Sequence, residues 1–151
     1  MNHLDREGKM NMVDVSSKEK TVRKAIASAQ LLLKACHLSA LELNPKGDVL
    51  AASRLAGIQA AKKCWELIPL CHQVALKNVS IEFQLTSNSI IITAEAVAED
   101  VTGVEMEGYC AVAVAGLTLI DMLKGVDPDL ILTEIKLLKK LGGKTDFDRT
   151  K

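Results

Sequence analysis

The strongest constraint on the fold is the alternation of apolar and polar side chains over residues 77–86, KNVSIEFQLT. An alternation of period two is that of a β-strand that buries one face. A Ser-Asn-Ser turn follows, and IIITAEAVAE then alternates again. Residues 77–98 are therefore predicted to form a β-hairpin. The apolar side chains of its first strand are Val79, Ile81, Phe83 and Leu85.

A long helix is predicted after this hairpin. Thr102 and Glu105 have the spacing of a capping box, and an Ala- and Gly-rich stretch continues to Lys124 and stops at Gly125. Its longest apolar run, residues 109–120, is bounded by charged side chains and is shorter than the ~20 residues that cross a bilayer. We therefore expect a helix that is buried inside the domain.

The rest of the chain supplies further strands and helices. They are a strand over 21–34, a helix over 35–43, a helix from an Asp48 cap to about Leu67, and a final strand over 130–141. This mixture predicts an α+β fold. A chain of 151 residues that is 48% hydrophobic suits a single domain. We assign that domain to residues 11–151 and expect the polar residues 1–10 to be disordered.

Composition removes several classes of function. Nineteen Lys and Arg residues balance nineteen Asp and Glu residues, so no overall positive field attracts nucleic acid or anionic lipid. Aromatic residues make up only 3% of the chain, too few for base-stacking platforms. The four cysteines form no CxxC pair and are expected to be buried small hydrophobes. The polar start MNHLDREGKM resembles neither a signal nor a transit peptide, so we expect a cytoplasmic protein.

Charged residues at the two ends of the predicted long helix are the first candidates for chemistry. Asp121 and Lys124 lie three apart, so they share a helix face at the rim of a buried layer, where protonation can be tuned. An ordinary ion pair at a helix end is the alternative. Glu105 and Glu107 begin the helix, where its dipole favours carboxylates. Glu107 adjoins the apolar run, and a guanine-like ring with N–H groups along one edge would suit it as a partner.

Three lysines lie beside glycine-containing turns. Lys46 belongs to a Pro-Lys-Gly-Asp turn, where glycine lets the backbone approach a ligand and the ammonium can exchange a proton. Lys140 and Lys144 flank a Gly-Gly pair and could cradle phosphate oxygens. A solvated loop lysine is the simpler interpretation of Lys46.

The segment Leu70-Cys71-His72 follows a proline and offers three interpretations. A metal site would need more ligands, and the other histidines, His3 and His37, are at no useful spacing. A nucleophile with its base is disfavoured, because neighbouring residues of an extended chain point to opposite faces. A polar grip on a ligand and a purely structural histidine remain as alternatives.

Three of these stretches together resemble a known family. They are KGDVLAASRLAGIQAAKKCWELIPLCH, TGVEMEGYCAVAVAGLTLIDMLKG and LLKKLGGK, and they closely resemble the cyclic pyranopterin monophosphate synthases, also called molybdenum cofactor biosynthesis protein C. The resemblance extends from about residue 12 to Lys144. It implies a ferredoxin-like subunit with long helices on an antiparallel sheet, assembled as a homohexamer, a trimer of dimers with active sites between subunits. The implied reaction converts 3′,8-cyclo-7,8-dihydroguanosine triphosphate into cyclic pyranopterin monophosphate and diphosphate.

The resemblance also implies roles for individual residues. It makes Lys46, Asp121 and Lys124 catalytic, with no redox cofactor and no metal held by the protein, and it leaves open whether magnesium accompanies the triphosphate. The substrate-binding positions it implies are Leu70, Cys71, His72, Glu105, Met106, Glu107, Lys140 and Lys144.

Two departures from the family pattern stand beside these motifs. Asn44-Pro45 precedes Lys46 where some relatives have histidines, and Thr145-Asp146 follows Lys144 where Ser-Gly is common. Two rival functions also stay open at this point. One is a non-catalytic nucleotide-binding or regulatory domain, and the other is a metal-dependent hydrolase that uses His72, Cys71 and the glutamates.

Overall fold

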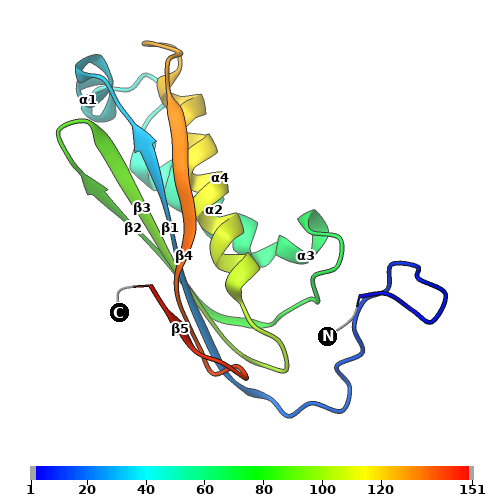
Figure 1. The fold of residues 1–151 in the computed structure, drawn as a ribbon. Helices are drawn as coiled ribbons and strands as arrows, with labels where there is room; N and C mark the ends of the chain where they lie inside the picture. The colour runs from blue at the N-terminus through cyan, green and yellow to red at the C-terminus, as the bar shows by residue number, and fades with distance from the viewer. Residues whose placement is uncertain (1–2, 150–151) are drawn as a thin grey trace.

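A computed structural model describes residues 3–149 and has two layers, a five-stranded antiparallel sheet and helices that cover one face of it (Figure 1). The strand order across the sheet is β2-β3-β1-β4-β5. The elements are β1 (Thr21–Leu32), α1 (Ala35–Glu42), α2 (Val49–Lys62), α3 (Cys64–Leu67), β2 (Leu76–Leu85), β3 (Ser89–Asp100), α4 (Glu105–Leu123), β4 (Ile131–Leu141) and β5 (Phe147–Asp148).

The α+β prediction and the hairpin are confirmed. Strands β2 and β3 pair antiparallel from the turn outward, with Leu85 opposite Ile90 and Ile81 opposite Ala94. Strands β1 and β4 lie where the sequence predicts them, and β1 joins the hairpin to β4 in the sheet. The sequence missed β5, a two-residue strand that pairs with Lys139 and Lys140 after the Gly-Gly turn.

Helix α4 packs closely against the sheet because the facing side chains are small. Alternate residues of β1 and β3 are buried, and many of them are alanine. An added Cβ on Gly108 would contact the Cβ of Ala27 at 3.4 Å, so the helix and the strand leave little space there. Nine of the 19 residues of α4 are buried, which confirms the expected core helix. Its length and apolarity alone would also suit a membrane span.

The capping box predicted for α4 is wrong. The helix begins after Val104, and no side chain caps its first turn. The Glu105 side chain instead lies against Gly103 and reaches the Lys140 ammonium, with Oε1 and Nζ 3.5 Å apart. The Glu105 carboxylate therefore pairs with Lys140 of β4. The capping-box spacing predicts instead that it accepts a hydrogen bond from the backbone at the start of the helix.

The helix predicted from Asp48 to Leu67 is present but interrupted. Asp48 caps it as expected, since its side chain accepts a hydrogen bond of 2.9 Å from the Ala51 N–H. Helix α2 ends at Lys62, and a separate turn, α3, continues to Leu67 in front of the proline. The interruption turns Cys64 inward, where it is buried.

The start of the segment before β1 forms a local turn. Residues 3–11 form a turn in which Leu4 and Met10 make a β-bridge, closed further by hydrogen bonds to Asp5. These contacts are internal to the segment, so the predicted disorder of residues 1–10 and the domain limit at residue 11 stay predictions.

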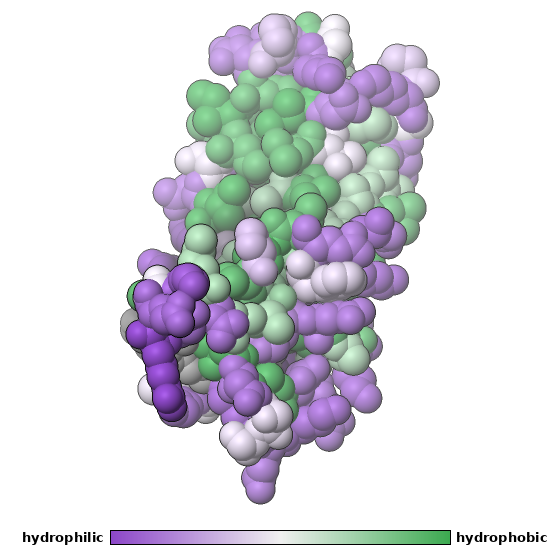
Figure 2. Space-filling view, turned by 90° about the vertical axis from the view of Figure 1, so that its right-hand side faces the viewer, coloured by the Kyte–Doolittle hydropathy of each residue, from purple (hydrophilic) through white to green (hydrophobic). Residues whose placement is uncertain are grey.

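Large apolar side chains are exposed on the helical layer. Figure 2 shows hydrophobic residues gathered on the face that is turned to the right in Figure 1. On helices α2, α3 and α4 the exposed residues include Leu55, Trp65, Leu67 and Leu117. An apolar surface of this kind on a folded chain is typical of a protein interface.

Gly57 provides a test of the packing between α2 and α4. A Cβ at this position would lie 2.7 Å from the Ala111 carbonyl oxygen and would also overlap the end of the Ile81 side chain. Because backbone cannot yield as a side chain can, Gly57→Ala should lower the free energy of unfolding by about 1–3 kcal/mol. Urea unfolding at one fixed protein concentration measures it. Gly125→Ala, where no atom lies within 4 Å, is the matched control. Equal effects of the two substitutions would contradict this packing.

Candidate functional site

Asp121 brings two lysines together at the carboxyl end of α4. Its Oδ1 lies 2.7 Å from the Nζ of Lys124, one helical turn further along. Its Oδ2 lies 3.3 Å from the Nζ of Lys46, which also donates a hydrogen bond of 2.6 Å to the Asp121 carbonyl oxygen. The two ammonium groups hold the pKa of Asp121 below its usual range, Lys124 contributing most. Three residues predicted as catalytic thus form one contact group, which we call the lysine–aspartate triad.

The triad lies at the surface of the single chain. The side chains of Lys46, Asp121 and Lys124 are 46%, 58% and 56% exposed. A substrate can therefore reach them from outside. The carboxyl end of α4 suits the two lysine ammonium groups, because the negative end of the helix dipole favours cations.

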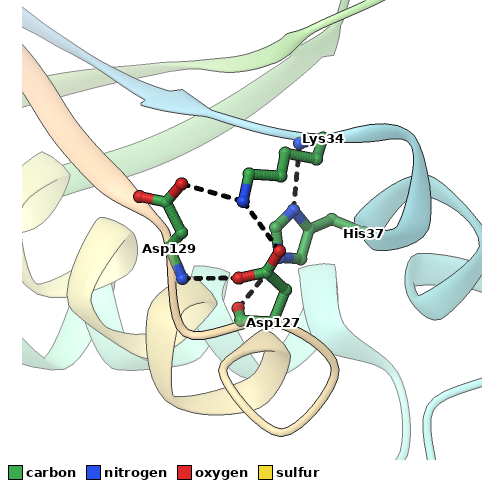
Figure 3. A network of polar contacts seen from close by, with 4 residues as sticks. All are labelled: Lys34, His37, Asp127 and Asp129. Atoms are coloured by element: carbon green, nitrogen blue, oxygen red, sulfur yellow. Dashed lines mark hydrogen bonds and ion pairs between the residues drawn. The ribbon is translucent and has the colours of Figure 1, made fainter.

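A network beyond the triad fixes the chain that leaves α4 (Figure 3). The Lys34 ammonium lies 2.8 Å from a carboxylate oxygen of both Asp127 and Asp129. His37, fully buried, accepts a hydrogen bond from the Lys34 backbone N–H at Nδ1. Its Nε2 donates a hydrogen bond to the Asp127 carbonyl oxygen. These contacts raise the pKa of Lys34 and fasten the loop after α4 to the end of β1.

The same network bears on metal binding. Cys36, His37 and Asp127 place potential ligand atoms within 4.8 Å of one another. Both ring nitrogens of His37 are already hydrogen-bonded, and the Lys34 ammonium already neutralises the carboxylate of Asp127. The cluster is therefore satisfied as it stands, without an ion.

Six of the eight predicted substrate-binding residues surround a cavity of about 310 Å³ at the amino end of α4. Residues Val13 and Val15 of the segment before β1 close one side of it. His72 contacts this segment, since its Nε2 donates a hydrogen bond of 2.8 Å to the Val13 carbonyl oxygen. The predicted residues that line the cavity are Leu70, Cys71, His72, Glu105, Met106 and Glu107.

Glu107 is the buried carboxylate of this cavity. It is only 4% exposed, and burial raises its pKa. Hydrogen bonds from its own backbone N–H and from the Cys64 thiol lower the pKa of Glu107, but by less than burial raises it. Because Glu107 also lines the cavity, a ligand with N–H donors could add further hydrogen bonds to this carboxylate.

The thiols of this region pack against one apolar cluster. Cys64 and Cys110 are buried with their sulfur atoms 3.6 Å apart, and Cys71 packs against the same apolar cluster. Protonated thiols are poor nucleophiles. Cys36 is exposed and Cys71 is only half-buried, so the expectation of burial is confirmed for Cys64 and Cys110 and is wrong for the other two.

The other two predicted substrate-binding residues line a neighbouring cavity of about 590 Å³. It holds Lys140 and Lys144, and it shares Thr102, Gly103 and Glu105 with the first cavity. The two cavities are therefore adjacent. Glu107 lines only the first, and Lys140 and Lys144 line only the second.

Sequence reasoning missed three cations in the second cavity. Lys18, Arg23 and Lys24 also line it. Arg23 donates a hydrogen bond of 3.2 Å to the Asp100 carbonyl oxygen, and Lys24 lies 2.6 Å from a Glu95 carboxylate oxygen. In the sequence these cations belong to the basic run KEKTVRK at 18–24. Only the pairing of β1 with β4 shows that this run lies beside Lys140.

The two parts of the predicted site are separated within one chain. Asp121 and Glu105 stand sixteen residues apart on the same helix, which is about 24 Å at 1.5 Å per residue. In Figure 1 the carboxyl end of α4 lies at the top, while β5 and the amino end of α4 lie at the bottom. The structure therefore forms the triad and the double cavity but does not bring them together in a single copy.

Comparison with known proteins decides the family. A model of the MoaC family matches residues 12–143. The chain belongs to the MoaC family. The match includes the triad and every residue that lines the two cavities except His3, Lys144 and Thr145.

Named members of the MoaC family are similar over nearly the whole chain. A cyclic pyranopterin monophosphate synthase of Streptomyces griseus is 44% identical, over 99% of this chain and 86% of its own length. One from Desulfatibacillum aliphaticivorans is 46% identical, over 95% of this chain and 92% of its own length. The molybdenum cofactor biosynthesis protein 1 of Bos taurus is 48% identical, but the chain spans only 24% of that protein.

The buried carboxylate predicts a pH dependence of stability. Because the pKa of Glu107 is raised above its ordinary value of 4.5, its stabilising contribution is complete below pH 4.5 and is lost as the pH rises through the folded-state pKa. Glu107→Gln removes this loss, so its advantage in free energy of unfolding over the wild type should grow with pH above about 4.5. Urea unfolding at several pH values measures it. Exposed Glu99→Gln is the control, with changes below ~0.5 kcal/mol at every pH. A difference for Glu107→Gln that stays constant with pH would contradict the assignment.

Proposed function

We propose that this protein is a cyclic pyranopterin monophosphate synthase of molybdenum cofactor biosynthesis. Its substrate would be (8S)-3′,8-cyclo-7,8-dihydroguanosine 5′-triphosphate, and its products cyclic pyranopterin monophosphate and diphosphate. The observation that carries the proposal is the contact of Asp121 with both Lys46 and Lys124, at 3.3 and 2.7 Å, from segments 75 residues apart. Family membership supports the same reaction.

The triad suits a reaction that consists of proton transfers. In the proposed reaction an imidazole ring opens, a pyrazine ring forms, and a sugar oxygen displaces diphosphate at the α-phosphate. Each step moves protons between nitrogen and oxygen atoms. Lys46 and Lys124 exchange these protons, and Asp121, which contacts both ammonium groups, sets their charge.

The double cavity suits the two chemically different parts of this substrate. Glu107 and Glu105 line the side that would accept the N–H groups of the guanine-derived ring. Lys140 and Lys144 line the other side and would hold the triphosphate and the departing diphosphate, with Arg23 and Lys24 beside them. Magnesium bound to the triphosphate would enter as part of the substrate.

The active site proposed here is shared between copies of the chain. A triad about 24 Å from the double cavity cannot act on a substrate bound there, so the triad of one subunit must face the cavity of another. The exposed apolar side chains of the helical layer supply surface for such contacts. The order β-α-β-β-α-β with strands 2-3-1-4 supports a ferredoxin-like subunit. A homohexamer, a trimer of dimers, in the cytoplasm is the assembly and location we propose.

The first test is the reaction itself. Purified protein incubated with the cyclised GTP triphosphate should release diphosphate and the cyclic monophosphate, both measured by chromatography. Lys124→Ala should lower turnover by about 10²–10⁴-fold, the usual contribution of a positioned acid or base, while substrate still binds. Binding without release by the wild type would favour a regulatory nucleotide-binding domain. Activity lost on removing a protein-bound metal would favour the hydrolase.

The second test asks whether the two halves of the site meet across subunits. Lys124→Ala damages the triad and leaves the cavities intact. The double variant Lys140→Ala/Lys144→Ala damages a cavity and leaves the triad intact. After unfolding and refolding together, their mixed dimers carry one intact site, so about a quarter of wild-type turnover should return. A mixture of Lys124→Ala with Lys46→Ala, which damage the same half, is the control and should stay inactive. Equal turnover of the two mixtures would rule out a shared site.

A further inference from the structure

Asn44 connects the turn that carries Lys46 to the end of α4. Its Oδ1 accepts a hydrogen bond of 2.9 Å from the Lys46 backbone N–H. Its Nδ2 donates a hydrogen bond of 2.9 Å to the carbonyl oxygen of Met122, the residue after Asp121. One side chain therefore fixes the backbone of Lys46 relative to the helical turn that presents Asp121.

The Nδ2 group of Asn44 bonds a carbonyl oxygen that has no partner within α4. The last four carbonyls of a helix lack an intrahelical partner, and α4 ends at Leu123. Asn44 takes the Met122 carbonyl, while the Lys46 ammonium takes that of Asp121 at 2.6 Å. The turn thus caps the helix through two neighbouring side-chain bonds.

Packing does little to hold this turn. An open cavity of about 670 Å³ lies against residues 41–45, 47, 48 and 50, and Leu43 is 86% exposed. Gly47 has φ near +101°, and its N–H bonds to the Asn44 carbonyl oxygen inside the turn. That bond shapes the turn but does not place it on the helix. Polar contacts of Asn44 and Lys46 provide the link to α4.

We infer that Asn44 is a positioning residue that holds the Lys46 ammonium in place beside Asp121 and Lys124. The inference rests on the proposed function, since it concerns the geometry of the triad. Asn44 itself bonds only backbone atoms, so it would act through Lys46. The bond between Asn44 Oδ1 and the Lys46 N–H would be enough to shape the turn. The bond from Nδ2 to the Met122 carbonyl oxygen joins positions 78 residues apart in sequence, so it fixes the turn to α4.

Kinetics of Asn44 variants provide the first part of the test. Asn44→Ala should lower kcat by about 10–100-fold with little change in KM, because a small displacement of a reacting group acts on the chemical step. Asn44→Ser keeps an oxygen for the local bond but cannot reach Met122, so it should show the same loss with the turn retained. Asn88→Ala is the matched control, since Asn88 bonds Thr86 within its own turn.

A double variant separates positioning from a structural role. If Asn44 acts through Lys46, then adding Asn44→Ala to Lys46→Ala should change kcat less than about 2-fold, because the two substitutions remove one function. A general structural role would lower kcat again by the full factor. Additive losses in the double variant would therefore overturn the inference.

A readout independent of turnover completes the experiment. Lys46 held against Asp121 should react slowly with an amine-specific acylating reagent, and its labelling rate can be followed by mass spectrometry of the peptide that contains it. Asn44→Ala and Asn44→Ser should raise this rate several-fold, while Asn88→Ala should not. Unchanged labelling overturns the inference even where the wild type turns over substrate. A wild type without turnover overturns the proposed function instead, and the labelling result still stands.

Discussion

Close packing of α4 between α2 and the sheet is the constraint on which the rest of the structure depends. The helix approaches β1 at Gly108 and Ala27, and α2 approaches it at Gly57. Side chains larger than these would force the layers apart. Once buried, α4 acts as a rigid spacer that keeps Glu105 and Asp121 about 24 Å apart along its axis. Every candidate functional group lies near one of its ends.

The two ends of α4 offer different chemistry. At the carboxyl end, carbonyl oxygens without helical partners and the negative end of the dipole attract Lys46 and Lys124, and Asp121 joins the two ammonium groups. At the amino end, Glu107 is buried, and the cations of β1 and β4 lie beyond it. A rigid helix keeps these environments apart, so one polypeptide presents the triad at one end of α4 and the two cavities at the other.

Both segments beside the triad are fastened by side chains that do not react. Lys34 and His37 hold the loop after α4 through Asp127 and Asp129, and Asn44 holds the turn before α2. Half-exposed lysines on flexible stems lose much rotamer freedom when they are fixed. Polar bonds to backbone carbonyls supply this order where packing is thin. Catalysis by positioned groups depends on such order.

The sequence by itself determined the identity of the residues in each motif and most of the elements, apart from β5 and the break between α2 and α3. Alternation fixed the hairpin, because a strand with one buried face must repeat every second residue, and the small residues of α4 fixed its burial. Only the tertiary structure decided which motifs meet. Lys46 reaches Asp121 across 75 residues, and Arg23 joins Lys140 only through the pairing of β1 with β4. Local spacing misplaced Glu105 in a capping box for the same reason, since its partner Lys140 lies on a strand that the sequence order does not bring near. Contacts between distant segments follow from how the layers pack, and no short stretch of sequence contains that information.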